Sequence, residues 1–287
     1  MHASIRRSLS LALILTGVAR AQSGSFINWE SPQAHPVDVT PDGRLLLVAN
    51  TADARLEVFD VTGKAPVRLG SVPVGLDPVS VRARGNGEAW VVNQISDSVS
   101  IVDLASLRVR RTVLVGDEPA DVVFAGTPQR AFVSLGIPER VAVVDAANPG
   151  TVTSIAIAGS QPRAMAVSPD GSRVYFTTHA WFGAGALPEA VAFADAYRAR
   201  FGEAPSGFAA LGFDAANVVL AALDRAHASG KGGDPAAVRA EIAATRGFVG
   251  ASGTIDFARG PVPAKDVWVV EVSAGTRALA SRVQPAR

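Results

Sequence analysis

Short apolar segments separated by turn residues follow one another through the first 178 residues of the chain. In the first unit, Val37-Asp38-Val39 and Leu45 to Asn50 are joined by Pro41-Asp42-Gly43, and Leu56 to Asp60 and Val67 to Val74 follow. Segments of this length rich in Val and Leu are typical of β-strands, and Pro-Asp-Gly is typical of a tight turn. The pattern predicts a unit of four short antiparallel strands.

This unit repeats along the chain. Pro36, Pro78, Pro119 and Pro162 open the successive units and stand 42, 41 and 43 residues apart. A period of about 42 residues matches one four-stranded blade of a β-propeller. The alignment makes two sets of positions equivalent: Asn50, Asn93 and Ser134, and Asp60, Asp103 and Asp145. The fourth unit stops after Thr178, so the repeats supply about three and a half blades.

The pattern becomes helical after Pro188. Apolar residues at three- and four-residue steps predict a helix from Pro188 to Phe201, closed by Gly202, and a second helix from about Phe213 to Ser229. Asp234-Pro235 predicts the start of a third helix, because Asp is a common N-cap and Pro a common first helical residue. Two strands are expected at 253–257 and 267–272. The fold class is therefore mixed, a partial all-β propeller followed by an α/β segment.

The chain begins with the pattern of a secretory leader. Arg6 and Arg7 precede an apolar run from Leu9 to Val18, and Ala19-Arg20-Ala21 resembles a cleavage site. We expect a signal peptide over 1–21 and a periplasmic or secreted mature protein. No later segment is expected to be long and apolar enough to span a membrane.

Composition narrows the classes of partner and of chemistry. The net charge is +1, and no basic stripe or acidic tail occurs, so neither nucleic acid nor an anionic membrane surface is an expected partner. The chain contains no cysteine, which excludes disulfides, thiolate metal sites and cysteine catalysis.

The repeats carry a specific family resemblance. The phrase Pro-x-x-Val-x-x-x-Pro-Asp-Gly, followed by segments such as Leu47-Val48-Ala49-Asn50 and Ile101-Val102-Asp103, resembles the YVTN family of β-propeller repeats over about 33–178. The resemblance implies an exported propeller, most members having about seven blades. Three and a half blades leave an open stack, a dimer that completes a ring, or a partly unfolded product. Residues 25–29 resemble the outer strand that would close a ring.

The last hundred residues resemble a second family. The segments 193–202, 209–216, 234–238 and 248–257 resemble, in the same order, the end of periplasmic substrate-binding proteins of the branched-chain amino acid type. The resemblance implies a fragment of a protein that holds an amino acid between two lobes and delivers it to an ABC transporter. It implies that Phe208 walls the ligand site. The family's serine and threonine ligand contacts lie in a portion that this chain lacks.

No catalytic constellation follows from residue types and spacing. His2, His35, His179 and His227 are not placed as a metal pair, so no metal or cofactor is expected. Asp60, Asp103 and Asp145 could ring a propeller channel, but acids at strand ends more often bind turn amides. Trp90, Trp181 and Trp268 lie in apolar segments and are expected in the core.

The leading hypothesis is an exported, non-catalytic binding or scaffold protein, chimeric or truncated. Under this hypothesis the chain divides into a signal peptide (1–21), a partial propeller (22–178), a seam (179–186) and a binding-protein fragment (187–287). The alternatives are a working ABC-transporter solute-binding component for amino acids and a lactonase-like or quinoprotein-like propeller enzyme. Expected partners are a small amino-acid-like ligand, an ABC permease, or a second copy through the open propeller edge.

Overall fold

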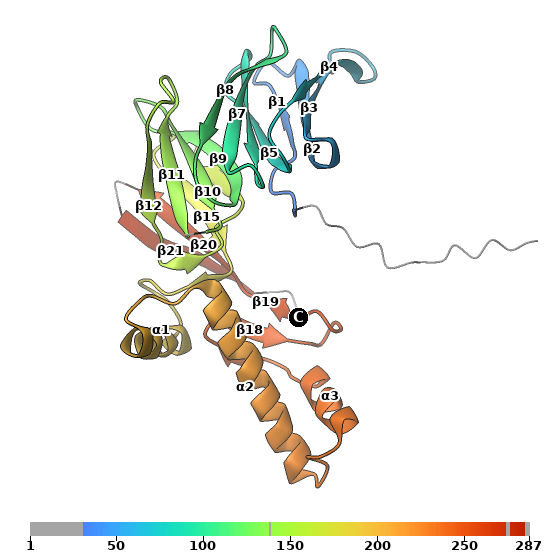
Figure 1. Cartoon of the computed structure of the whole chain (residues 1–287), viewed down its shortest axis with the longest axis vertical. Coiled ribbons are helices and arrows are strands. Elements are labelled where there is room, and N and C mark those ends of the chain that lie inside the picture. The colour runs from blue at the N-terminus through green and yellow to red at the C-terminus, as the bar shows by residue number, and fades with distance from the viewer. Residues whose placement is uncertain (1–30, 138, 274–275, 285–287) are drawn as a thin grey trace, which may run out of the picture.

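The computed structural model describes residues 31–137, 139–273 and 276–284. The predicted signal peptide and the predicted closing strand at 25–29 lie outside these residues. Four four-stranded antiparallel sheets form a curved stack, and the helices lie below its last sheet (Figure 1). The mixed fold class is therefore confirmed.

The first three sheets are the blades that the repeats predict. Blade 1 contains β1 (Val37–Val39), β2 (Leu45–Asn50), β3 (Arg55–Asp60) and β4 (Val67–Pro73), and a short 3-10 turn, η1 (Thr51–Asp53), lies between β2 and β3. Blade 2 contains β5 (Pro78–Ala83), β6 (Glu88–Asn93), β7 (Ser98–Asp103) and β8 (Arg108–Leu114). Blade 3 contains β9 (Pro119–Ala125), β10 (Arg130–Leu135), β11 (Arg140–Asp145) and β12 (Val152–Ala156).

The fourth sheet is built from both halves of the chain. Its first two strands, β14 (Met165–Val167) and β15 (Val174–Thr178), are the half-repeat, and its last two are β20 (Val267–Ser273) and β21 (Thr276–Val283). β20 pairs antiparallel with β15 from Val174↔Val272 to Thr178↔Trp268. The C-terminal hairpin thus takes the place of the two strands that the fourth repeat lacks.

The remaining elements form the α/β segment between β15 and β20. They are α1 (Pro188–Phe201), α2 (Gly207–Ala228), α3 (Pro235–Ala243), β17 (Phe248–Gly250), β18 (Gly253–Asp256) and β19 (Ala264–Lys265). In the seam, β16 (Ala180–Trp181) pairs with β13 (Gly159–Ser160). Gly202 closes α1 with φ 76°, and the Asp234 side chain caps α3, as predicted.

The second helix differs from the prediction. α2 begins at Gly207, where the Ser206 hydroxyl accepts a hydrogen bond from the Ala209 amide, and not near Phe213. With 22 residues it is long and apolar enough to cross a bilayer, so the expectation that no later segment has this property was wrong. Such a helix is also typical of a globular domain. Arg225 on α2 pairs with Glu241 on α3, with Nε and Oε2 2.8 Å apart.

Blade-to-blade packing forms most of the core, as expected for a repeat that cannot fold alone. Blade 1 packs on blade 2 through Leu47, Leu56 and Val58, and blade 2 packs on blade 3 around Trp90 and Ile101. Trp90, Trp181 and Trp268 are all fully buried, which confirms their predicted place.

The strand register corrects one set of equivalent positions. Asn50 and Asn93 each end the second strand of a blade and pair with Arg55 and Ser98. In blade 3 this position belongs to Leu135, which pairs with Arg140, so Ser134 was aligned one residue out. The stretch from Pro119 to Leu135 is one residue longer than the stretch from Pro78 to Asn93, and the sequence pattern alone did not reveal this difference.

Candidate functional site

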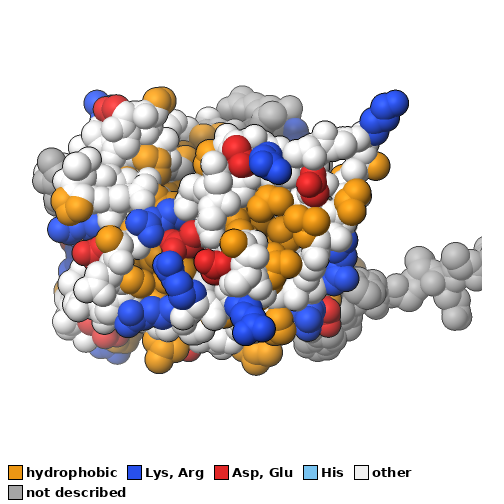
Figure 2. Space-filling model, turned by 90° about the horizontal axis from the view of Figure 1, so that it is seen from above, with side chains coloured by type: hydrophobic (Ala, Val, Ile, Leu, Met, Phe, Trp, Pro, Cys, Tyr) orange, Lys and Arg blue, Asp and Glu red, His pale blue; other side chains and the backbone are white. Residues whose placement is uncertain are grey.

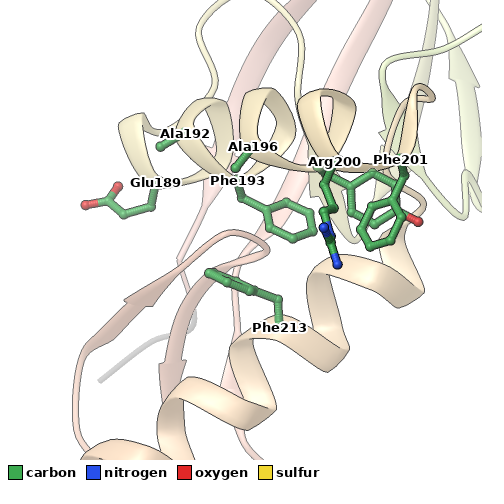
Figure 3. Close-up of a pocket in the computed structure, with 8 residues that line it drawn as sticks. Glu189, Ala192, Phe193, Ala196, Arg200, Phe201 and Phe213 are labelled. Atoms are coloured by element: carbon green, nitrogen blue, oxygen red, sulfur yellow. The ribbon is translucent and has the colours of Figure 1, made fainter.

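An apolar pocket lies between α1 and α2. Its volume is about 490 Å³. Figure 3 shows Phe193 on α1 and Phe213 on α2 pointing toward one another, with Arg200 and Phe201 at one end and Glu189 at the other. The lining consists of Glu189, Ala192, Phe193, Ala196, Tyr197, Arg200, Phe201 and Phe213.

Helical spacing brings these aromatic rings together. Phe193, Tyr197 and Phe201 follow one another at four-residue steps, so they share one face of α1. The ring centroids of Phe193 and Tyr197 are 5.8 Å apart, and those of Tyr197 and Phe201 are 4.5 Å apart. Phe213 approaches Phe193 from α2 to a centroid distance of 4.8 Å. Such tilted pairs are favourable beyond their buried area.

The pocket can bind an apolar or aromatic group and orient a charged one. Phe201 and Phe213 remain 60% and 47% exposed, so much of the aromatic wall is available to a ligand. The Arg200 guanidinium at the rim is suited to a carboxylate, because it offers several N–H donors in one plane. Glu189, at the other end, is suited to an amine.

Phe208, the residue that the family resemblance implies, lies outside this pocket. It is on the first turn of α2 and is 57% exposed. The sequence did not single out Phe213 as a site residue, although it occurs in the quoted motif. The signal that could have found the pocket was the four-residue spacing of aromatic residues on α1.

A buried polar cluster holds α2 against the β17–β18 turn. Asp214, beside Phe213, accepts hydrogen bonds from the amides of Ala251 at 2.7 Å and Ser252 at 2.8 Å. The Ser252 hydroxyl also donates to Asp214 and accepts from Lys265 Nζ. Burial lowers the pKa of Lys265, against the opposing pull of the Asp214 and Asp266 carboxylates. The cluster fixes the α2 turn that carries Phe213.

A second, more polar pocket of about 410 Å³ lies beside the first strands of all four blades, and Asp38, Arg82, Phe124 and Met165 are among its lining residues. Arg82 on β5 forms an ion pair with the fully buried Asp121 on β9, with Nη2 and Oδ2 2.9 Å apart. Arg82 Nη2 also donates to the Met165 carbonyl at 3.1 Å. The ion pair therefore links neighbouring blades. These structural contacts occupy most of the hydrogen-bonding capacity of Arg82 and Asp121.

His35 lies close to this polar pocket, at the position where the following units have Asp77, Glu118 and Gln161. Burial, and then the nearby Arg82 guanidinium, lowers the pKa of His35, and Asp121 and Asp38 partly oppose them. Its backbone binds blade 2, since the His35 carbonyl accepts from the Val81 amide at 2.9 Å. This contact gives His35 a structural role at the start of the first repeat.

The chain resembles known families and solved structures in both of its halves. Residues 16–170 match the YNCE-like beta-propeller, and residues 119–277 match the periplasmic binding protein family. Each match covers more than half of the chain. The chain belongs to both families. The matches overlap at 119–170, and the structure places that stretch in blades 3 and 4 of the propeller.

Solved structures of both kinds resemble the chain. A hydrazine synthase from Kuenenia stuttgartiensis is 23% identical, covers 57% of this chain and 46% of its own, and has a TM-score of 0.48. A protein from Bacteroides uniformis described as a 6-phosphogluconolactonase is 17% identical over 52% of this chain and 48% of its own, with a TM-score of 0.43.

A leucine-binding protein, LivK, from Thermotoga maritima is 35% identical over 39% of this chain and 31% of its own, with a TM-score of 0.32. The chain therefore spans less than half the length of each of these structures. A search of curated proteins finds no match.

In the propeller half, the aspartates at the strand ends serve turns. Asp60 accepts from the Thr62 amide at 2.8 Å, and Asp103 accepts from the Ser106 amide at 2.7 Å. Asp145 accepts from the Ala147 amide at 2.9 Å. The pKa of each of the three carboxyls is lowered most by one hydrogen bond, which comes from the Thr62 hydroxyl to Asp60, from the Ser106 amide to Asp103 and from the Asn148 amide to Asp145. The structural interpretation of this set is confirmed.

Among the described residues, no group of three or more His, Cys, Asp or Glu side chains could hold a metal ion. His179, in the seam, faces Gln161, with Nδ1 and Oε1 3.2 Å apart. On the face seen in Figure 2, acidic and basic side chains are interspersed with apolar ones.

Proposed function

We propose that the protein is an exported, non-catalytic binding and scaffold protein, a chimera in which a propeller carries the end of a periplasmic binding protein. The aromatic pocket between α1 and α2 is the observation that supports it. The pocket has the size for a small ligand. The family assignment of this half favours an amino-acid-like ligand with an apolar side chain.

Calorimetric titration of the mature chain with leucine, phenylalanine and valine tests ligand capture. We expect Phe213→Ala to weaken binding at least about tenfold, because it removes the ring that faces Phe193. Phe208→Ala is the matched control, since both residues are exposed phenylalanines on α2. Loss of binding on Phe208→Ala alone would instead favour the position that the resemblance implies. The absence of heat and of any thermal shift in the wild type would contradict the proposal.

A second candidate function is a working solute-binding component that delivers its ligand to an ABC permease. Membership of the periplasmic binding protein family favours it. The test is ligand-dependent association of the mature chain with permease-containing membranes of its source. Binding of ligand without such association would leave the binding and scaffold proposal standing and exclude the transport one.

The non-catalytic part of the proposal has its own test. We expect no turnover of lactones or alcohols, with or without pyrroloquinoline quinone and calcium. Turnover that survives Phe213→Ala and is lost on Arg82→Ala would place an enzyme site in the propeller half. This result would contradict the proposal that the protein is non-catalytic.

A further inference from the structure

The face of blade 1 that points away from blade 2 is largely apolar, and none of the described residues covers it. Two of its residues on β1, Val37 and Val39, are 45% and 43% exposed. The strand register places Val48 beside Val37 and Leu46 beside Val39, and Phe59 lies beside Leu46. A hollow of about 350 Å³ opens here and is lined in part by Val48, Glu57 and Phe59.

The equivalent face of blade 4 shows what covers such a surface. The pairs Val37↔Val48 and Val39↔Leu46 of blade 1 correspond to Met165↔Phe176 and Val167↔Val174 of blade 4. In blade 4 these side chains pack against Val123 and Val141 of blade 3. We call the side of a blade that contacts the preceding blade its back face. Blade 1 therefore has an uncovered back face of the kind that every later blade buries.

Blade 4 has the opposite kind of face unpaired among the described residues. We call the side that contacts the following blade the front face. In blade 1 the front-face residues Leu47, Leu56 and Val58 are fully buried against blade 2. Their counterparts on blade 4 by strand position are Tyr175, Val269 and Glu271, and all three are partly exposed. Each junction between the described blades joins a front face to a back face. The two ends of the described stack therefore leave one face of each kind unpaired.

We propose that a second copy of this chain covers both uncovered faces, so that two four-bladed stacks close one eight-bladed ring. The front face of blade 4 in each copy packs on the back face of blade 1 in the other. A front-to-back contact made twice about a two-fold axis closes, and eight blades lie within the usual range of propellers. The hollow beside Phe59 has the size for one aromatic side chain, and Tyr175 of the second copy is the front-face residue that fits it.

Light scattering and sedimentation of the mature chain across micromolar concentrations test the ring. We expect a dimer in the wild type. Val39→Lys on the back face and Val269→Lys on the front face should each weaken dimerisation at least about tenfold, because the junction would have to remove a long charged side chain from water. Leu114→Lys is the matched control, since Leu114 is 74% exposed on β8 of blade 2. It should leave the dimer unchanged.

Mixing the two variants separates the ring from other dimers. A mixed pair of Val39→Lys and Val269→Lys chains has one junction with both faces intact and one with both altered. Such a pair should therefore associate more tightly than either variant alone. A monomer at all concentrations would overturn the proposal, as would a dimer that neither variant weakens. A dimer weakened by Val39→Lys but not by Val269→Lys would show a back-to-back contact and would also overturn it.

Discussion

The Asp121 carboxylate, fully buried in the stack, connects three blades. It accepts hydrogen bonds from the Ser80 hydroxyl of blade 2 at 2.6 Å and from the Met165 amide of blade 4 at 2.8 Å. The Arg82 guanidinium neutralises its charge. A buried carboxylate is tolerated only when it is paired and hydrogen-bonded, and here both conditions are met by neighbouring blades. Asp121 therefore favours a single arrangement of blades 2, 3 and 4 in the stack.

His35, near this ion pair, should make stability depend on pH. Because burial lowers the pKa of His35 in the folded protein, the unfolded chain binds the proton more tightly. Stability attributable to His35 is present above about pH 6.5 and is lost as the pH falls toward the lower folded value. His35→Gln, which copies the fourth repeat, should flatten the fall in Tm between pH 7 and pH 5.

Thermal unfolding followed by circular dichroism at several pH values measures this effect. The comparison at pH 8, where the wild-type imidazole is neutral in both states, reports the change in packing alone and serves as the baseline. The Tm difference between wild type and variant should shift in favour of the variant as the pH falls. A difference that stays constant from pH 8 to pH 5 would contradict the assignment.

Single residues were the hardest feature to predict from the sequence. The turn aspartates were predicted because their hydrogen bonds are local. Asp121 and Arg82 lie 39 positions apart, and their pairing depends on how two blades stack. The pocket partner Phe213 likewise depends on the crossing of α1 and α2. Phe208 was inferred from a family motif, and its role stays a prediction.

The hairpin of β20 and β21 takes the place of the third and fourth strands of a propeller blade, although its sequence is not a propeller repeat. Val267 to Ser273 is rich in valine, and buried positions alternate with more exposed ones along it, as in a third propeller strand. Val270 is fully buried and packs with Phe176 and Trp268 against blade 3. β20 therefore completes the fourth blade through its pattern, although it lies within the binding-protein family match.

Val270→Asp should disrupt the fourth blade. An unpaired carboxylate at this fully buried position should reduce the free energy of unfolding by more than about 3 kcal/mol. Denaturant unfolding monitored by tryptophan fluorescence measures the loss, because Trp268 lies in the same strand. Val262→Asp, at a residue that is 80% exposed, is the control and should change little. Equal stability of the two variants would mean that β20 does not pack in the blade.

The blades and helices were predictable because each depends on a local pattern. The first three blades, the end of α1 at Gly202 and the cap of α3 at Asp234 follow the sequence prediction. The sheet that Val267 to Ser273 joins was not predictable, because a valine-rich segment predicts a strand but not its partner strands. The start of α2 at Gly207 was missed because the two glycines in its first turns are poor helix formers.

At the level of the entire chain, the binding-protein segment is an insertion within the fourth blade. The last residue of β15, Thr178, pairs directly with Trp268 near the start of β20. The two ends of the intervening segment therefore meet at one edge of the sheet. The helices lie below the stack, next to this edge of the fourth sheet (Figure 1). A connection between adjacent antiparallel strands needs only a few residues, so the fold of the blades does not require the helices.

Replacement of residues 183–263 by a short Gly/Ser linker should leave the four-bladed stack folded. The variant should lose the helical circular dichroism signal and keep the β-sheet signal and the buried-tryptophan fluorescence of Trp90 and Trp268. Some stability should be lost, because Ala186 and Leu187 pack on the core of blades 3 and 4. The same linker combined with Val270→Asp is the control, and it should unfold the fourth blade. A linker variant that aggregates or loses the sheet signal would show that the helices are needed to hold the hairpin in the propeller.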